Sequence, residues 1–313
     1  MTAFTSLSSQ EQEVFSPVET ILAGKTLYNE LLARYTSWRV GGPADHYYRP
    51  ANISDLSVFL KQLDYNQPLF WLGAGSNLLI RDGGIRGTVI HLKRTLNQIR
   101  LEDDGRLYIE AGVSCPQVAR FCQQNGLSGA SFMVGIPGSI GGALAMNAGA
   151  FGGETWPLVS EVELIDRQGN RQWLPSTAIH VGYRNVSIPH EHWFVATRLS
   201  LPATANVDDE EIQRLLDQRR NSQPINVPTC GSVFKNPEHG FAAQLIEQCG
   251  LKGHQIGKAR VSTKHTNFIE NLGGASAFDI ELLINHVKNC VEQQQSVRLD
   301  CEVRIVGERV TPL

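Results

Sequence analysis

Charged side chains are absent from one long stretch of the sequence, the residues between Arg120 and Glu154. A membrane span needs roughly 20 consecutive apolar residues. Glutamine, asparagine and serine interrupt this stretch, and large aliphatic side chains are sparse in it, so we expect no membrane insertion. Its second half, GIPGSIGGALAMNAGAFGG at residues 135–153, is instead rich in glycine, which indicates a backbone that approaches a bound group closely.

A secretion signal, a metal-binding cysteine pattern and a basic excess are also missing. The N-terminal segment MTAFTSLSSQEQEVFSP is polar and acidic, whereas a signal peptide needs a cationic and then an apolar segment, so we expect a cytoplasmic protein. The six cysteines form no C-x-x-C pair, which favours reduced, mostly buried thiols and no metal site. A net charge of -3 argues against a nucleic-acid partner, and no pattern indicates an obligate protein partner.

The pattern of apolar residues divides the 313 residues into four parts. We expect a polar arm and short helix at residues 1–34, where Val18, Ile21 and Leu22 have helical spacing. A small α/β unit follows at 35–92, with a helix over 53–66 capped by Ser54, and a strand-rich unit at 93–206 with a helix over 115–126. The last part, 207–313, predicts helices near 207–220, 241–250 and 277–295 and a strand over 297–307.

Two glycine-rich loops are candidates for holding a cofactor. The loop GAGSNL fails the dinucleotide-binding fingerprint G-x-G-x-x-G, because Leu78 stands at the third glycine and a strand is predicted to follow. Its backbone N–H groups could still bind an anion, and Pro137 predicts a helix start whose free N–H groups would bind phosphate. Together the loops predict a cradle for the diphosphate of a dinucleotide. Its members are Gly73, Ala74, Gly75, Ser76, Asn77, Leu78, Gly135, Ser139, Gly141 and Gly142.

The chain from about Tyr35 onward resembles the UDP-N-acetylenolpyruvoylglucosamine reductase (MurB) family of bacterial cell-wall synthesis. The motifs that carry this resemblance occur in order: TSWRVGGPAD, LGAGSNLL, GIPGSIGGALAMNAGAFGGE, GYRNVSIP, CGSVFKNP, GLKGHQIGKARVSTKHTNFIEN and CEVRIVG. The resemblance implies an α+β fold: a two-subdomain FAD-binding fold of the vanillyl-alcohol-oxidase (PCMH) type, followed by a C-terminal α/β substrate-binding domain.

The resemblance also implies an activity. NADPH reduces non-covalently bound FAD, and UDP-N-acetylglucosamine enolpyruvate then takes hydride from flavin N5 and a proton, which gives UDP-N-acetylmuramate. Motif matches place the proton donor at Ser232, with Arg184 and Glu302 beside the substrate carboxylate. The implied substrate contacts are Tyr183, Asn236, Lys252, His265 and Arg304. Because no tyrosine follows Tyr183, the chain is similar to the shorter subtype without a tyrosine-bearing substrate loop.

The residues themselves fit this chemistry, although each has a plainer interpretation. Reduction of an enol ether develops negative charge beside a carboxylate, which a fixed arginine such as Arg184 stabilises. Taken alone, Arg184 and Ser232 would be ordinary turn residues. In VRLDCEVRI, side chains alternate between the two faces of a strand, which places Glu302 and Arg304 on one polar face. That face either forms the base of a cleft or faces solvent.

Two other functions remain open at this point. An oxidase of a small alcohol or lactone could use the same fold, but such relatives often bind FAD covalently through histidine or cysteine, and neither residue occurs in the two glycine loops. A non-catalytic module that binds a nucleotide sugar or flavin would keep the loops but would not need Arg184, Ser232 and Glu302 together.

Overall fold

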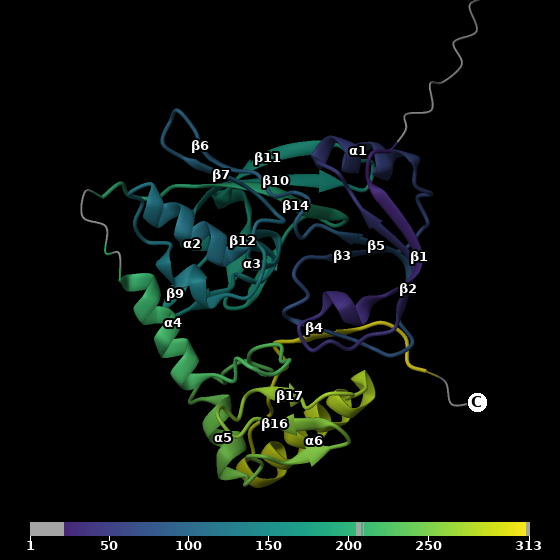
Figure 1. The fold of residues 1–313 in the computed structure, drawn as a ribbon, viewed down its shortest axis with the longest axis vertical. Helices are drawn as coiled ribbons and strands as arrows, with labels where there is room; N and C mark the ends of the chain where they lie inside the picture. The colour runs from purple at the N-terminus through teal and green to yellow at the C-terminus, as the bar shows by residue number, and fades with distance from the viewer. Residues whose placement is uncertain (1–21, 205–207, 209, 311–313) are drawn as a thin grey trace, which may run out of the picture.

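Three β-sheet units pack together in the computed structural model, which describes residues 22–204, 208 and 210–310 (Figure 1). The helix predicted near Val18 and Ile21 lies outside the described residues. None of the helices within the described ranges is both long and apolar enough to cross a membrane.

The first unit is a four-stranded sheet in the order β1-β2-β5-β3, with β1 antiparallel to β2 and the other pairs parallel. Its elements are β1 (Lys25–Leu31), β2 (Pro43–Arg49), α1 (Ile53–Gln62), β3 (Leu69–Leu72) and β5 (Ile85–His91). The sheet therefore begins at Lys25, before the predicted boundary at residue 35. Asn52, rather than Ser54, caps α1, since its side chain accepts a hydrogen bond from the N–H of Asp55 at 2.9 Å.

The second unit is a five-stranded antiparallel sheet in the order β11-β10-β14-β7-β6. Its strands are β6 (Ile99–Leu101), β7 (Leu107–Glu110), β10 (Val159–Asp166), β11 (Arg171–Pro175) and β14 (His192–Leu199). The helices α2 (Cys115–Gln124) and α3 (Ile140–Met146) pack their apolar side chains into one core with this sheet. Two short hairpins accompany them, β8 (Gly149–Ala150) with β9 (Gly153–Glu154), and β12 (His180–Gly182) with β13 (Asn185–Ser187). The helix predicted over 115–126 is confirmed.

Helix α4 (Glu211–Ser222) runs along the edge of the molecule and leads into the third unit (Figure 1). That unit contains α5 (Ala242–Gln248), α6 (Ala277–Gln295) and an antiparallel sheet of β15 (Gln255–Ile256), β16 (Ala259–Val261) and β17 (Ile269–Asn271). Ser276 and Asp279 form a capping box at the start of α6. Asp82 of the first unit accepts two further hydrogen bonds there, from the N–H groups of Ala277 and Phe278 at 2.9 and 3.0 Å.

The long strand predicted over 297–307 is wrong in extent. Only β18 (Arg304–Val306) is a strand, and it pairs in parallel with β4 (Leu78–Ile80) of the first unit. Residues before it bond instead to the loop at 233–235 through isolated hydrogen bonds, so no continuous ladder forms. The predicted alternation nevertheless holds, because Leu299 and Val303 are buried in the core of the third unit.

The first and third units share that core. Trp38, which is fully buried, donates its indole N–H to the carbonyl of Ile269 at 2.7 Å, and its own carbonyl accepts from Asn271 Nδ2 at 2.8 Å. Val40 and Leu79 pack in the same cluster. Residues 38–40 and β4 are therefore held against the third unit.

Candidate active site

A cavity of about 390 Å³ lies where the three units meet. Its walls come from the β3–β4 loop, the loop before α3, the β12–β13 turn, residues 230–236 and the chain entering β18. Of the predicted site residues, fifteen line it: Gly73, Ala74, Gly75, Ser76, Asn77, Leu78, Gly135, Ser139, Gly142, Tyr183, Arg184, Ser232, Asn236, Glu302 and Arg304. Segments that are distant in sequence thus converge on one site.

The β3–β4 loop is held in shape from behind. Gly75 has φ 62°, and a Cβ there would lie 2.0 Å from the carbonyl oxygen of Tyr35, so the position requires glycine for packing against protein rather than ligand. Its carbonyl accepts from the N–H of Ser37 at 3.0 Å. Among the described residues, the backbone N–H groups of residues 74–77 donate to no protein acceptor, which leaves them available to an anion.

A buried histidine supports the same loop. The hydroxyl of Tyr47 lies 2.6 Å from His91 Nδ1, and His91 Nε2 lies 3.1 Å from the carbonyl oxygen of Gly73. Burial lowers the pKa of His91 to about 4, so the ring is neutral near pH 7. A neutral ring accepts from Tyr47 and donates to Gly73, which fixes the first residue of the loop.

The second loop differs from its prediction in two respects. Helix α3 begins at Ile140, so Pro137 precedes the helix and is not its first residue. The N–H groups of Ile140 and Gly141 are not free, because they donate to the carbonyls of Val113 and Ala111, both at 2.8 Å. Gly141 therefore faces the second sheet, where a Cβ would lie 2.9 Å from the Cβ of Ala111, and it does not line the cavity.

The remaining residues of this loop fit a flavin diphosphate. Ser139 is 2% exposed, and its hydroxyl has no hydrogen-bond partner within the described chain. A buried hydroxyl without a partner costs free energy, which a phosphate oxygen would recover. A Cβ at Gly142 would find only the Ser139 hydroxyl nearby, at 3.9 Å, so this position is open to the cavity. Met146, Ala148 and Ala150 supply apolar surface suited to a ring system.

Arg184 enters the cavity from a tight turn. Tyr183 and Arg184 are the two residues between β12 and β13, and Arg184 has φ 51°, an uncommon conformation for a side chain of its size. Its Nη1 donates to the carbonyl of Asn147 at 2.8 Å and its Nη2 to that of Gly149 at 3.3 Å. The guanidinium is therefore fixed, and it is not the freely exposed turn arginine of the plainer interpretation.

Ser232 and Glu302 lie on two chain segments that bond to each other. The N–H of Glu302 donates to the carbonyl of Val233 at 2.8 Å, directly after Ser232. Asn267 clamps the same loop, because its side-chain oxygen accepts from the N–H of Phe234 at 3.0 Å and its amide nitrogen donates to that residue's carbonyl at 2.9 Å. The serine and the carboxylate are thereby held on one wall of the cavity.

Glu302 pairs with Arg184, whose Nε lies 3.3 Å from Glu302 Oε1. Burial raises the pKa of Glu302 above its ordinary value, and the nearby cations Arg184 and Lys235 oppose that rise. A carboxyl with a raised pKa and a fixed cation beside it are typical of a site where charge changes during a reaction.

The predicted substrate contacts divide into two groups. Tyr183, Asn236 and Arg304 line the cavity. Lys252 pairs with Glu247 at 2.9 Å on the surface, and half-buried His265 packs edge-on against Phe268 with ring centres 4.7 Å apart. Neither of these two side chains lines the cavity, so their contact with a substrate stays a prediction.

Several residues of the site were missed from the sequence. Arg219 and Gln223 at the end of α4 line the cavity, as do Asn267 and Met146. The only sequence signal was the basic end DQRR of α4, which the helix dipole already explained. Within the described chain, no group of three or more histidine, cysteine, aspartate or glutamate side chains is placed to hold a metal ion.

Two domain families match separate parts of the chain. The model of an FAD binding domain matches residues 44–174, and that of the UDP-N-acetylenolpyruvoylglucosamine reductase C-terminal domain matches residues 223–306. The predicted FAD-binding unit and C-terminal domain are thus confirmed.

Similar proteins cover almost the whole chain. A UDP-N-acetylenolpyruvoylglucosamine reductase of Methylococcus capsulatus is 53% identical over 91% of this chain and 94% of its own. One from Alkalilimnicola ehrlichii is 51% identical over 92% of this chain and 97% of its own. The crystal structure of UDP-N-acetylenolpyruvylglucosamine reductase (MurB) from Thermus caldophilus covers 91% of this chain and 99% of its own, with 31% identity and a TM-score of 0.77. The chain therefore belongs to the UDP-N-acetylenolpyruvoylglucosamine reductase family.

Proposed function

We propose that the protein reduces UDP-N-acetylglucosamine enolpyruvate to UDP-N-acetylmuramate for peptidoglycan synthesis, with NADPH as reductant and FAD as resident cofactor. When bound, FAD would supply the hydride that the substrate takes up. The observation that carries the proposal is the convergence of Arg184, Ser232 and Glu302 on the cavity enclosed by the two glycine-rich loops. The names of relatives that are about half identical support it. We place the activity in the cytoplasm, where NADPH is available.

The chain's own residues would act on the charge that hydride addition creates. When hydride adds to the methylene carbon, the electron pair of the double bond moves to the carbon that bears the carboxylate. Arg184, already held by two backbone carbonyls, offers a cation to that carboxylate without having to reorganise. The hydroxyl of Ser232 gives its proton to the carbon and regains one from solvent, and Gly231 leaves room for this approach.

Glu302 orients the arginine and borders the substrate carboxylate. An ionised carboxylate beside another is unfavourable, and the burial that raises the pKa of Glu302 reduces that repulsion. Asn236 is placed by α5, because its side-chain oxygen accepts from the N–H of Ala242 at 3.1 Å, which leaves its amide N–H groups for the nucleotide sugar. Tyr183 and Arg304 also line the cavity.

An oxidase with covalently bound flavin is not favoured. Cys230 lines the cavity, but burial raises the pKa of its thiol to about 12, and the thiol hydrogen points to the carbonyl of Leu78 at 3.6 Å. A thiol with so high a pKa is a poor nucleophile near pH 7. A non-catalytic binding module is not favoured either, because it would not need the Arg184–Glu302 pair beside Ser232.

The proposed function is tested by following the flavin. The purified protein should absorb as a flavoprotein and should release FAD on denaturation. Under anaerobic conditions NADPH should bleach the flavin band, and UDP-N-acetylglucosamine enolpyruvate should restore it. Protein that cannot take up FAD, or reduced flavin that the enolpyruvyl substrate does not reoxidise, would disprove the assignment.

A further inference from the structure

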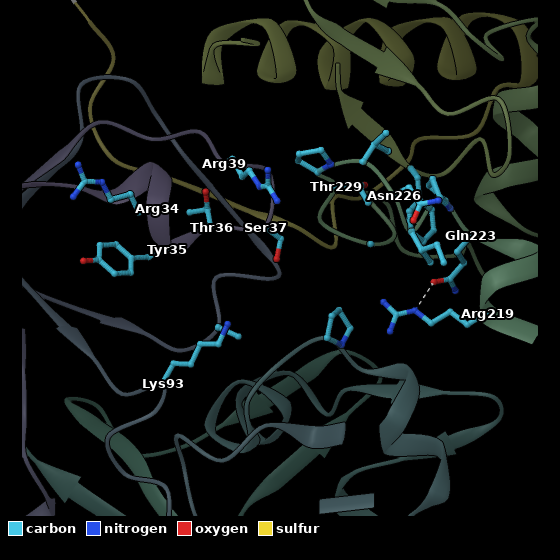
Figure 2. Close-up of a pocket in the computed structure, with 18 of the residues that line it drawn as sticks. Arg34, Tyr35, Thr36, Ser37, Arg39, Lys93, Arg219, Gln223, Asn226 and Thr229 are labelled. Carbon is cyan, nitrogen blue, oxygen red and sulfur yellow. Dashed lines mark hydrogen bonds between the residues drawn. The ribbon is translucent and has the colours of Figure 1, made fainter. Parts of the chain in front are cut away.

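A second, larger cavity of about 860 Å³ lies beside the active-site cavity (Figure 2). We call it the basic cavity, because seven lysine and arginine residues and no aspartate or glutamate line it. These are Arg34, Arg39, Arg49, Lys93, Arg94, Arg219 and Arg220. The chain as a whole has a net charge of -3, so this concentration of positive charge is local.

Most of these cations lack an anionic partner. Arg39, Arg49, Lys93 and Arg94 form no ion pair or side-chain hydrogen bond with any described residue. Figure 2 shows Arg39, Lys93 and Arg219 directed toward the cavity from three sides. Uncompensated cations around one partly open cavity repel one another, so the arrangement favours an anionic ligand.

Arg219 gives the strongest indication. It is half-buried, and burial lowers its pKa. Its Nε donates to Gln223 Oε1 at 3.2 Å, which orients the guanidinium but does not neutralise it. A desolvated cation without a counter-ion is costly to the fold, and a bound phosphate would compensate it.

Two further features point to a ligand. Arg39 and Arg94 have φ 58° and 65°, and strained backbone of this kind clusters at binding sites. The hydroxyl of Thr229, which borders the basic cavity, is buried and has no partner among the described residues. A phosphate oxygen would satisfy it.

The two cavities lie side by side. They share Ala74, Pro137, Arg219, Gln223, Gly231 and Phe268. A ligand could therefore place one end beside the flavin cradle and the other among the unpaired cations. The cradle already provides N–H groups and the Ser139 hydroxyl for the flavin diphosphate, so the basic cavity is left for a different polyanion.

We propose that the basic cavity binds the phosphate groups at the adenosine end of NADPH, its 2′-phosphate in particular. This rests on the proposed function, in which NADPH is the reductant. NADPH must bring its nicotinamide to the flavin in the neighbouring cavity while its adenosine end lies some distance away. The 2′-phosphate adds negative charge that NADH lacks, and arginine is the side chain that commonly accommodates it.

The test titrates the FAD-loaded protein by calorimetry with adenosine 2′,5′-bisphosphate and with AMP, two nucleotides that differ in the 2′-phosphate. Wild type should bind the bisphosphate more tightly. The variant Arg49→Gln/Lys93→Gln, and separately Arg39→Gln, should weaken bisphosphate binding about 10- to 100-fold, as for loss of hydrogen bonds to a charged group. AMP binding should change much less. Arg120→Gln, an exposed arginine outside both cavities, is the matched control and should change neither affinity.

Two outcomes would overturn this assignment. Equal affinity of wild type for both nucleotides would show that the cavity does not read the 2′-phosphate. A fall in FAD affinity of the apoprotein of Arg49→Gln/Lys93→Gln, as large as the fall for the bisphosphate, would assign the cavity to the flavin instead. Neither binding measurement needs turnover. Failure of the proposed function would be seen separately, as wild-type flavin that NADPH does not reduce.

Discussion

In the proposed mechanism, the hydroxyl of Ser232 acts only after hydride has left the flavin, so its removal should affect one half-reaction selectively. Ser232→Ala should bind FAD and be reduced by NADPH at a near-normal rate. Reoxidation by UDP-N-acetylglucosamine enolpyruvate should slow by about 10²- to 10⁴-fold, the usual contribution of a positioned acid. Stopped-flow absorbance measures each half-reaction separately. Ser232→Cys should recover part of the rate, since a thiol also donates a proton; unchanged reoxidation of Ser232→Ala would exclude the serine as donor.

Arg184 tests geometry at constant charge. Arg184→Lys keeps a cation but loses the planar group that bonds Asn147 and Gly149 while facing Glu302. The substrate half-reaction should therefore slow by roughly 10-fold or more, as expected for an oriented charge in the transition state. Flavin reduction should change little. Equal slowing of both half-reactions would indicate that the arginine only maintains the structure of the turn.

His91 predicts a specific pH dependence. Its pKa is about 4 in the folded protein and its ordinary value is 6.5, so between these values the unfolded chain binds a proton that the folded chain does not. Stability is therefore fully present above pH 6.5 and falls as the pH drops toward 4, by up to about 3 kcal/mol. His91→Gln cannot titrate, so its urea-unfolding free energy should depend less on pH over this range. Exposed His180→Gln is the control, and equal slopes for the two variants would contradict the role of His91.

Within the α3 segment, Gly142 and Gly141 have different tasks. A side chain at Gly142 enters the cavity, whereas one at Gly141 meets Ala111 and one at Gly75 meets the carbonyl of Tyr35. Gly142→Val should therefore lower FAD affinity by at least about 10-fold, and Gly142→Ala should have a smaller effect, while both proteins stay folded. Flavin titration with circular dichroism checks this. Unchanged flavin affinity in both variants would remove this part of the cradle.

The same glycines show how far sequence reasoning reached at the level of helices, strands and loops. Helices α2 and α6 were predictable, because their apolar spacing and local start signals are contained in the segment itself. The sequence could not predict which N–H groups at the start of α3 are free. The carbonyls that accept from Ile140 and Gly141 belong to Val113 and Ala111, which lie some 30 residues away. The sequence motifs predicted the two glycine-rich loops and the residues Arg184, Ser232 and Glu302. The basic cavity did not, because Arg39, Lys93 and Arg219 come together only in the folded chain.

For the molecule as a whole, Asp82 is a link between the first and third units. Its carboxylate accepts the N–H groups of Ala277 and Phe278 at the start of α6. Asp82→Ala should destabilise the protein by about 1 kcal/mol, the usual cost of a lost helix cap. Denaturant unfolding measures this, with exposed Asp103→Ala as control. Equal stability of the two variants would show that the capping box alone secures α6.

The pairing of β18 with β4 bears on how the enzyme is made. Asn77 of the β3–β4 loop donates its side-chain amide to the carbonyl of Glu302 at 3.0 Å, a contact between residues 225 positions apart. The backbone carbonyl of Asn77 accepts from the N–H of Arg304 at 3.1 Å. Synthesis must therefore have passed residue 304 before the loop can take its final shape. Flavin capture should be among the last events of biogenesis, and yellow colour would report that the C-terminal strand has docked.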